Sequence, residues 1–154
     1  MPIRRLHSCT PRVLQSCHVT WLFLRETQVA FGYLVVTTSM QCCIYSLQNL
    51  NTPHIFDLKE TVNYIQLGEK YFLMVDNAGL TVYSYEGRTI STPRFTGMRP
   101  EVCNERTVSL SNECLVLVDH SDAKLVRVLE TTTGKELSKP IQHVLDVTSV
   151  AVNR

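Results

Sequence analysis

Short apolar stretches separated by residues that favour turns give this chain a pattern typical of β-strands. The clearest example has an apolar run at residues 71–75, a turn at residues 76–79 and an alternating stretch at residues 80–85. Because alternate residues of a strand point to opposite faces, Leu80 and Val82 share one face of the second strand. These features predict a β-hairpin. The same design occurs upstream at residues 34–38 and 41–47, and downstream at residues 114–118 and 124–129.

The hairpins recur at a similar spacing, 38 residues from Tyr45 to Tyr83 and 44 residues from Val82 to Val126. Units of about 40–45 residues with four short strands each are typical of β-propeller blades. The sequence therefore predicts an all-β fold, a partial WD40-like β-propeller of about three four-stranded antiparallel blades. Since a closed propeller needs at least about four blades, we expect this one not to be closed and the chain to be a fragment of a longer one.

The turns between strands set the predicted boundaries. Blades are expected at residues 29–60, 61–97 and 105–143, and a further blade is expected to start at residues 144–154. Outer strands are expected at residues 54–58, 89–95 and 137–142, and a loop at residues 48–53. The valine-rich residues 147–152 are predicted to form the first strand of the further blade.

Residues 1–28 form a divergent leader whose structure the pattern does not define. The first 24 residues contain Arg4, Arg5 and Arg12 but no acidic residue. The apolar stretch at residues 19–24 is much shorter than the roughly 20 residues of a membrane span. Three interpretations stay open: an outer strand, a mitochondrial transit peptide, and a non-native start from an alternative exon or gene model, of which we favour the last.

The composition, 44% hydrophobic and 19% charged, fits a soluble globular chain rather than a disordered one. With a formal net charge of +1 and scattered basic residues, neither nucleic-acid binding nor membrane insertion is predicted. The six cysteines include no CxxC pair, so free thiols are expected rather than a zinc site. Adjacent Cys42 and Cys43 are predicted to point to opposite faces of a strand.

Two groups of residues have types that occur in functional sites, and each also has a structural interpretation. Residues 119–122 (Asp-His-Ser-Asp) contain the side chains of a catalytic triad, but a triad assembles from separate positions, and Asp and Ser favour backbone bonding in turns. Tyr45, Tyr83 and Tyr85 could line an aromatic platform, but packing between blades is the stronger interpretation. We therefore predict no catalytic, cofactor-binding or metal-binding residues, no cofactor and no enzymatic activity.

Several strings carry a closer resemblance. YLVVTTSMQCCIYS, NTPHIFDLKE, VYSYEGRTISTPRFTGMR, TVSLSN and TGKEL resemble, in this order, the second propeller of the intraflagellar transport protein 80 family. Members of this family are WD-repeat subunits of intraflagellar transport complex B, with two propellers and a helical-repeat region. The resemblance runs from about residue 29 to the C-terminus. This chain departs from the family pattern because it lacks the first propeller and the helical region, and because its leader does not match.

The resemblance implies a non-enzymatic scaffold or protein-interaction module, needed for cilium assembly and for transport along ciliary microtubules. It implies other complex B subunits as partners and a location in the cilium, at its axoneme or basal body, and in the cytoplasm. The alternatives are a propeller fragment of a vesicle coat or other trafficking scaffold, and a β-propeller enzyme. Loops at residues 49–53, 96–106 and 120–124 are the candidate contacts, and self-association is expected through open blade edges.

Overall fold

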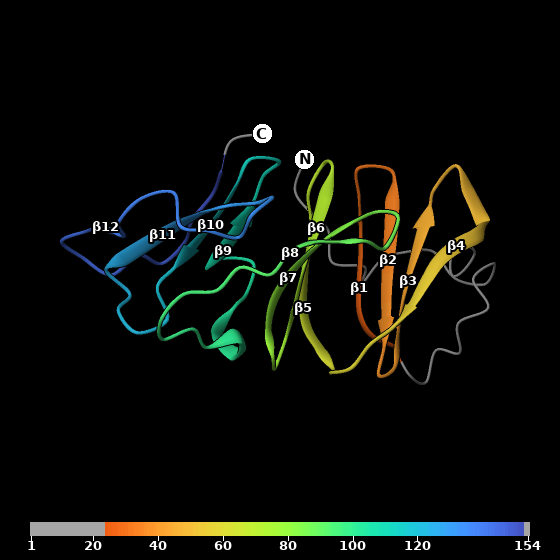
Figure 1. Cartoon of the computed structure of the whole chain (residues 1–154), viewed down its shortest axis with the longest axis horizontal. Helices are drawn as coiled ribbons and strands as arrows, with labels where there is room; N and C mark the ends of the chain where they lie inside the picture. The colour runs from red at the N-terminus through yellow and green to blue at the C-terminus, as the bar shows by residue number, and fades with distance from the viewer. Residues whose placement is uncertain (1–23, 153–154) are drawn as a thin grey trace.

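Three four-stranded antiparallel sheets stand in a row in the computed structural model, which describes residues 24–152 (Figure 1). This confirms the predicted unclosed stack of three blades. Sheet A comprises β1 (Leu24–Ala30), β2 (Tyr33–Thr38), β3 (Gln41–Ser46) and β4 (Asn49–Asp57). Sheet B comprises β5 (Val62–Leu67), β6 (Tyr71–Asp76), β7 (Gly79–Ser84) and β8 (Thr89–Ser91). Sheet C comprises β9 (Val108–Leu110), β10 (Cys114–Val118), β11 (Leu125–Glu130) and β12 (Ile141–Gln142).

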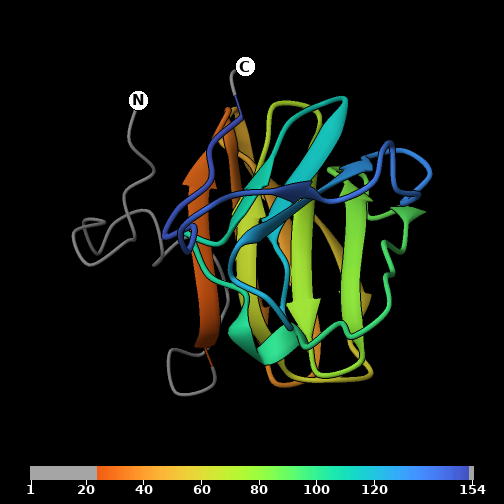
Figure 2. The same ribbon diagram turned by 90° about the vertical axis from the view of Figure 1, so that its left-hand side faces the viewer.

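Each sheet is a meander in which strands adjacent in sequence are paired in space. The first strands of successive sheets are neighbours, β1 beside β5 and β5 beside β9. Seen from the end where sheet C lies, the three sheets follow one behind another (Figure 2). One short 3-10 turn, η2 (Pro100–Val102), lies in the connection between sheets B and C.

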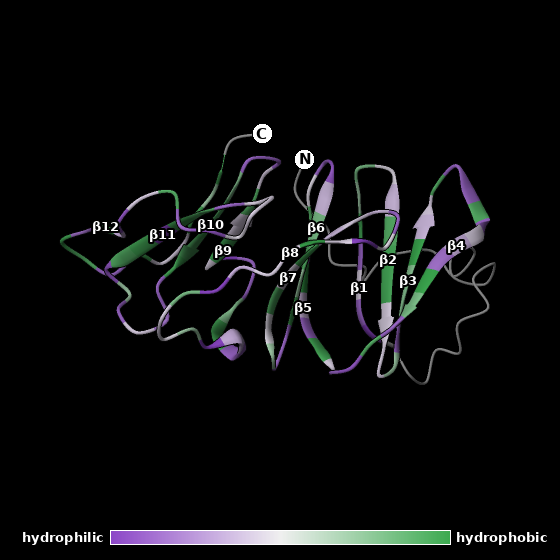
Figure 3. Cartoon of the chain, in the orientation of Figure 1, coloured by the Kyte–Doolittle hydropathy of each residue, from purple (hydrophilic) through white to green (hydrophobic). Residues whose placement is uncertain are grey.

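Two apolar clusters hold the stack together. One joins sheets A and B, with Val35, Ile44 and Phe72 among its buried members. The other joins sheets B and C, with Leu73 and Leu115 fully buried. The middle strands are accordingly hydrophobic along much of their length, while the connecting loops are largely hydrophilic (Figure 3). Burying both faces of sheet B gives the stack its cohesion, because apolar burial is the main favourable term in folding.

The turn between the second and third strand of every sheet is capped in the same way. The side chain at the end of the second strand accepts hydrogen bonds from the backbone N–H groups two and three residues further on. Thr38 Oγ1 does this in sheet A, Asp76 Oδ1 in sheet B and Asp119 Oδ1 in sheet C. Asp and Thr suit this role because their short side chains reach their own backbone. The repeat is therefore chemical as well as topological.

Polar side chains of the first strands differ in whether they bond to a neighbouring segment. Gln28 of β1 accepts a hydrogen bond from the backbone N–H of Leu67 in β5, with Gln28 Oε1 and Leu67 N 3.3 Å apart. Ser109 of β9 accepts one from the backbone N–H of Val152, at 3.0 Å. Gln66 of β5 is also buried, but its Oε1 has no hydrogen-bond partner in the described part of the chain.

Several predicted boundaries differ from the structure. The loop predicted at residues 48–53 is wrong, because β4 already begins at Asn49. Pro53 is tolerated inside β4 because β4 is the outer strand, where one edge needs no N–H donor. The outer strands β8 and β12 are shorter than predicted, and Pro93 and Pro140, which lack an N–H, lie beside them.

Both ends of the described range also differ from expectation. Strand β1 begins at Leu24, inside the segment assigned to the leader, and residues 1–23 lie outside the described residues. Residues 147–152 do not form the predicted strand, since a strand needs a paired neighbour and no described strand pairs with them. Backbone N–H groups nevertheless hold this segment beside sheet C, because Val147 donates to Ala123 O and Val150 to Arg106 O.

Candidate functional site

Two of the three predicted contact regions lie together and form one surface. Residues 96–106 connect sheets B and C, and residues 120–124 connect β10 to β11; together they are called the loop surface here. The backbone N–H of Arg99 donates to Nδ1 of His120 at 2.6 Å, and the Arg99 guanidinium donates to the His120 carbonyl oxygen at 2.6 Å. The third region, residues 49–53, belongs to the outer strand β4 of sheet A at the other end of the stack (Figure 1).

His120 is the buried centre of the loop surface. Its ring packs edge-on against Phe95, with the ring centres 5.0 Å apart, and its Nε2 lies 3.5 Å from Sγ of Cys103. Because Nδ1 accepts a hydrogen bond from Arg99, the neutral ring carries its proton on Nε2, which faces the sulfur. Burial lowers the pKa of His120 below its ordinary value. The ring is therefore held neutral, and Nδ1, its one acceptor nitrogen, is already bonded to the N–H of Arg99.

The thiol beside His120 is not activated. Burial, with a smaller contribution from Glu101, raises the pKa of Cys103 to about 12. A catalytic cysteine needs a lowered pKa and a base that accepts its proton. Since Nε2 of His120 is itself a donor toward the sulfur, the pair ties the loop to the hairpin and supplies no nucleophile.

An ion pair next to His120 fixes the base of the hairpin. Asp119 accepts a charge-assisted hydrogen bond from Nε of Arg127, whose guanidinium also contacts Glu136 and lies 4.8 Å from the centre of the Phe95 ring. Burial alone raises the pKa of Asp119, but hydrogen bonds from Ser121, Arg127 and the backbone outweigh it and lower this pKa to about 2. The carboxylate therefore stays charged and bonded at neutral pH.

The Asp, His and Ser side chains within residues 119–122 do not assemble a catalytic triad. The hydroxyl of Ser121 donates directly to Asp119 at 2.6 Å, whereas His120 is bonded to Arg99. As predicted, the four residues lie in the connection between β10 and β11, where the side chains of Asp119 and Asp122 accept hydrogen bonds from the backbone.

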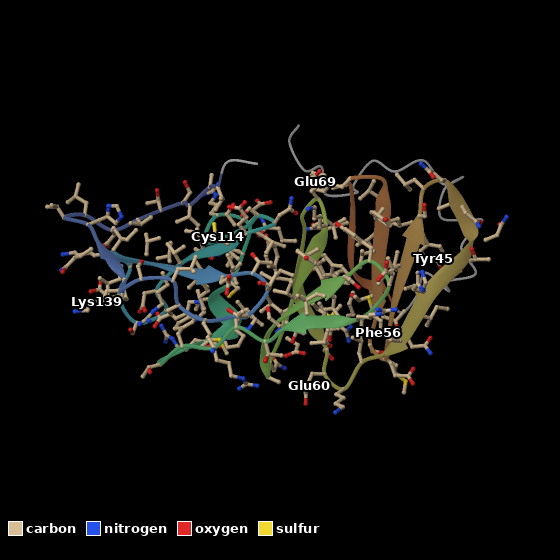
Figure 4. The ribbon with its side chains drawn as sticks, turned by 45° about the horizontal axis from the view of Figure 1, so that its top comes forward. Tyr45, Phe56, Glu60, Glu69, Cys114 and Lys139 are labelled. Atoms are coloured by element: carbon tan, nitrogen blue, oxygen red, sulfur yellow. The ribbon has the colours of Figure 1, made fainter. Side chains whose placement is uncertain are left out.

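The tyrosines also separate into two groups. Tyr83 and Tyr85 pack at the contact between sheets A and B, where Tyr85 stacks on Tyr33 with ring centres 3.8 Å apart and Tyr83 stacks on Phe56 at 5.0 Å. This confirms the predicted packing role for both. Tyr45 belongs to the cluster on the opposite face of sheet A, so the three rings do not form a platform (Figure 4).

Sequence reasoning missed one exposed surface at the far edge of sheet C. Four large apolar side chains are solvent-exposed there, Val144 at 88% and Leu145 at 78%. These residues, with Leu137 and Ile141, are called the C-terminal apolar patch here. Monomeric proteins rarely expose contiguous apolar groups without a partner. The signal available in the sequence was the string IQHVLDV, which spans the predicted boundary between the third blade and the further blade.

The described residues offer no obvious site for a metal ion, since no three His, Cys, Asp or Glu side chains cluster within residues 24–152. Cys42, Cys43, Cys103 and Cys114 are free thiols. In the same range, no helix is long and apolar enough to cross a bilayer.

Comparison with known proteins shows which family the three-sheet stack resembles. The family model described as IFT80 second beta-propeller matches residues 24–154. The intraflagellar transport protein 80 homologs of Rattus norvegicus and Mus musculus are each 46% identical over 126 residues, which cover 80% of this chain and 16% of the relative. The chain thus spans less than a fifth of the length of these curated relatives.

Solved structures agree on the fold alone. Apo AztD from Citrobacter koseri matches with a TM-score of 0.60 at 13% identity, over 83% of this chain and 38% of that one. Kluyveromyces lactis Hsv2p matches with a TM-score of 0.52 at 13% identity, over 77% and 37% of the two chains. From its family match and its 46% identity to these relatives, the chain belongs to the IFT80 second beta-propeller family.

Proposed function

We propose that this chain is a non-enzymatic scaffold section of the second propeller of an intraflagellar transport complex B subunit. In this role it serves cilium assembly and transport along ciliary microtubules, at the axoneme or basal body and in the cytoplasm. Its partners are other complex B subunits, and it needs no nucleic acid, membrane insertion or cofactor. The observation that carries the proposal is the family match over residues 24–154, which falls on three consecutive blades.

The loop surface suits a scaffold because its backbone is held before any partner arrives. His120, Arg99 and Cys103 tie the long connection to the hairpin, and the Asp119–Arg127 pair fixes the hairpin below it. A surface that is already ordered loses little conformational entropy on binding. The exposed side chains of Glu101, Glu105 and Arg106 are then free to select the partner.

The ends of the stack favour association as well. The C-terminal apolar patch is exposed to solvent, and β12, the outer strand of sheet C, pairs on one side only within the described residues. Exposed strand edges and apolar patches promote pairing with another chain. We therefore include self-association through open blade edges in the proposal, in competition with further blades of a longer chain.

The absence of catalysis is part of the proposal. It is supported by the one buried Cys–His contact that the loop surface contains, in which the thiol has a raised pKa and the ring has no free base. A catalytic cysteine needs the reverse arrangement, a thiol with a lowered pKa beside a free base.

The test is quantitative co-purification from ciliated cells that express the tagged chain. We expect enrichment of complex B subunits, and we expect it to fall when the exposed pair Glu105 and Arg106 is exchanged for Lys and Glu. The matched control exchanges the exposed pair Lys59 and Glu60, in the corner between sheets A and B, for Glu and Lys (Figure 4). Enrichment of vesicle-coat subunits instead of complex B subunits would contradict the proposal.

A further inference from the structure

The outer strand of sheet A has a much longer edge than the outer strands of the other two sheets. Strand β4, at one end of the stack, has nine residues, whereas β8 has three and β12 has two (Figure 1). Natural sheets protect their edges with short outer strands or with charged side chains, lysine above all. Residues 49–56 contain no Lys, Arg, Asp or Glu. Strand β4 therefore lacks both kinds of protection.

The pairing with β3 shows which backbone groups of β4 point away from the sheet. Just beyond β4, the N–H of Leu58 donates to the carbonyl oxygen of Met40 at 2.7 Å. Because hydrogen bonding alternates along an antiparallel ladder, every second residue counted back from Leu58 faces β3 with its backbone groups, and the residues between them face outward. The outward residues are Pro53, Ile55 and Asp57. Since proline has no N–H, the edge offers the N–H groups of Ile55 and Asp57 and the carbonyl oxygens of all three, and no strand within residues 24–152 pairs with it.

We propose that this edge binds an extended peptide segment of a partner protein, which joins sheet A as an additional antiparallel strand. The peptide residue opposite Ile55 exchanges two backbone hydrogen bonds with it, and the residue opposite Asp57 does the same. The residue opposite Pro53 donates one hydrogen bond to its carbonyl oxygen. The antiparallel direction is chosen because it is the more stable pairing per residue.

The side chains of the outward residues define the chemistry of the partner. Ile55 is 55% exposed, and an apolar cross-strand pair stabilises a sheet, so the peptide residue opposite it is Val or Ile. Asp57 is exposed and is the only charged residue of β4, so the residue opposite it is Lys or Arg. Because the two strands run in opposite directions, the basic residue comes two positions before the β-branched one in the peptide.

A second copy of β4 is the weaker candidate for this edge. If two β4 strands paired antiparallel about Ile55, Asp57 of each copy would lie opposite Pro53 of the other. Proline has no N–H to return to the carbonyl oxygen of Asp57, and it offers no positive charge to the carboxylate. A partner segment with a basic residue at this position satisfies both groups.

The first test measures hydrogen exchange of single amides by NMR in the intact chain. The probe is the synthetic peptide Thr-Arg-Thr-Val-Thr-Val-Thr, which places Arg opposite Asp57 and the first Val opposite Ile55. At saturation we expect exchange of the Ile55 and Asp57 amides to slow on the order of tenfold, while the amides of His54 and Phe56, which face β3, are unchanged. Unchanged exchange of Ile55 and Asp57, or equal slowing of all four amides, overturns the proposal.

The second test measures the affinity of the peptide for variants by titration calorimetry. Ile55→Pro removes an outward N–H that makes no bond to β3, and Pro53 shows that β4 accommodates proline. We expect its affinity to fall on the order of tenfold, whereas the matched control Ile55→Val keeps the N–H and binds like the unmodified chain. Asp57→Lys should weaken binding of this peptide about fivefold and strengthen binding of the peptide with Glu in place of Arg.

The outcomes separate the explanations. Equal affinity of Ile55→Pro and Ile55→Val overturns the proposal. Protection of the Ile55 and Asp57 amides that exists without peptide and is lost on dilution identifies a second copy at the edge, and this also overturns it. If Ile55→Pro unfolds, a peptide N-methylated at the Val opposite Ile55 decides, because it cannot donate there and must bind on the order of tenfold more weakly. All measurements use the purified chain, so their result is independent of the proposed role in complex B.

Discussion

The buried ion pair between Asp119 and Arg127 provides a quantitative test of how the loop surface is held. The side chain of Asp119 is 1% exposed, and its pKa is lowered from 3.8 to about 2. A difference of this size in pKa corresponds to about 2 kcal/mol of folding stability at neutral pH. Asp119→Asn keeps the shape of the side chain and an oxygen that accepts the backbone bonds from Ser121 and Asp122, but it removes the charge. We expect it to lower the free energy of unfolding by about 2 kcal/mol at pH 7.

Urea unfolding followed by circular dichroism at a series of pH values measures this effect. A carboxyl whose pKa is lowered in the folded state contributes stability above its ordinary pKa of 3.8, and the contribution is lost as the pH falls through about 2. The difference between the unmodified chain and Asp119→Asn should therefore disappear over this range. Asp146→Asn, at an exposed position, is the control and should change stability by less than about 0.5 kcal/mol. Equal stability of the chain and Asp119→Asn at pH 7, or a difference that persists at pH 2, would refute the reasoning.

Three further predictions concern the contacts between blades and the ends of the stack. Gln28→Leu should lower the free energy of unfolding by about 1–3 kcal/mol, because a buried backbone N–H loses its acceptor, whereas Gln66→Leu should be neutral or stabilising; urea unfolding that ranks them the other way contradicts this. Gly134→Ala should cost about 2–3 kcal/mol, since φ is +71° and the added Cβ would lie 3.0 Å from backbone atoms. Gly32→Ala, with φ of +80° and open space around the added Cβ, should cost about 1 kcal/mol. Equal decreases in the thermal unfolding temperature of the Gly134→Ala and Gly32→Ala variants would contradict this. Leu145→Lys should lower the weight-average mass in sedimentation equilibrium, and an unchanged mass would show that the C-terminal apolar patch does not mediate association.

The central strands were predictable from the sequence because their determinants are local. Residues 71–85 combine an apolar run, a turn with Asp and Gly, and alternation, and the structure places β6 and β7 there. The capping roles of Asp76 and Asp119 follow from the same short-range chemistry. Packing of Tyr83 and Tyr85 between blades was likewise inferred from aromatic residues on strands.

The outer strands and the loop surface depended on distant residues and were harder to predict. Strand β4 extends through Asn49 and Pro53 because β3 pairs with it, although this segment has the composition of a loop. The contact between His120 and Arg99 joins residues that are 21 positions apart in sequence, and no local motif marks it. The sequence indicated residues 96–106 and residues 120–124 as separate contact regions. Only the fold shows that they form one surface.

The central claim, that these blades act as a scaffold section of a ciliary transport subunit, is tested most directly by complementation. In cells that lack the mouse intraflagellar transport protein 80 homolog, the full-length mouse protein is supplied with its matching segment replaced by residues 24–152 of this chain, and ciliated cells are counted. The account predicts that cilia return, because the three sheets present equivalent faces to the rest of the propeller. A replaced protein that accumulates to normal levels without restoring cilia would contradict the account.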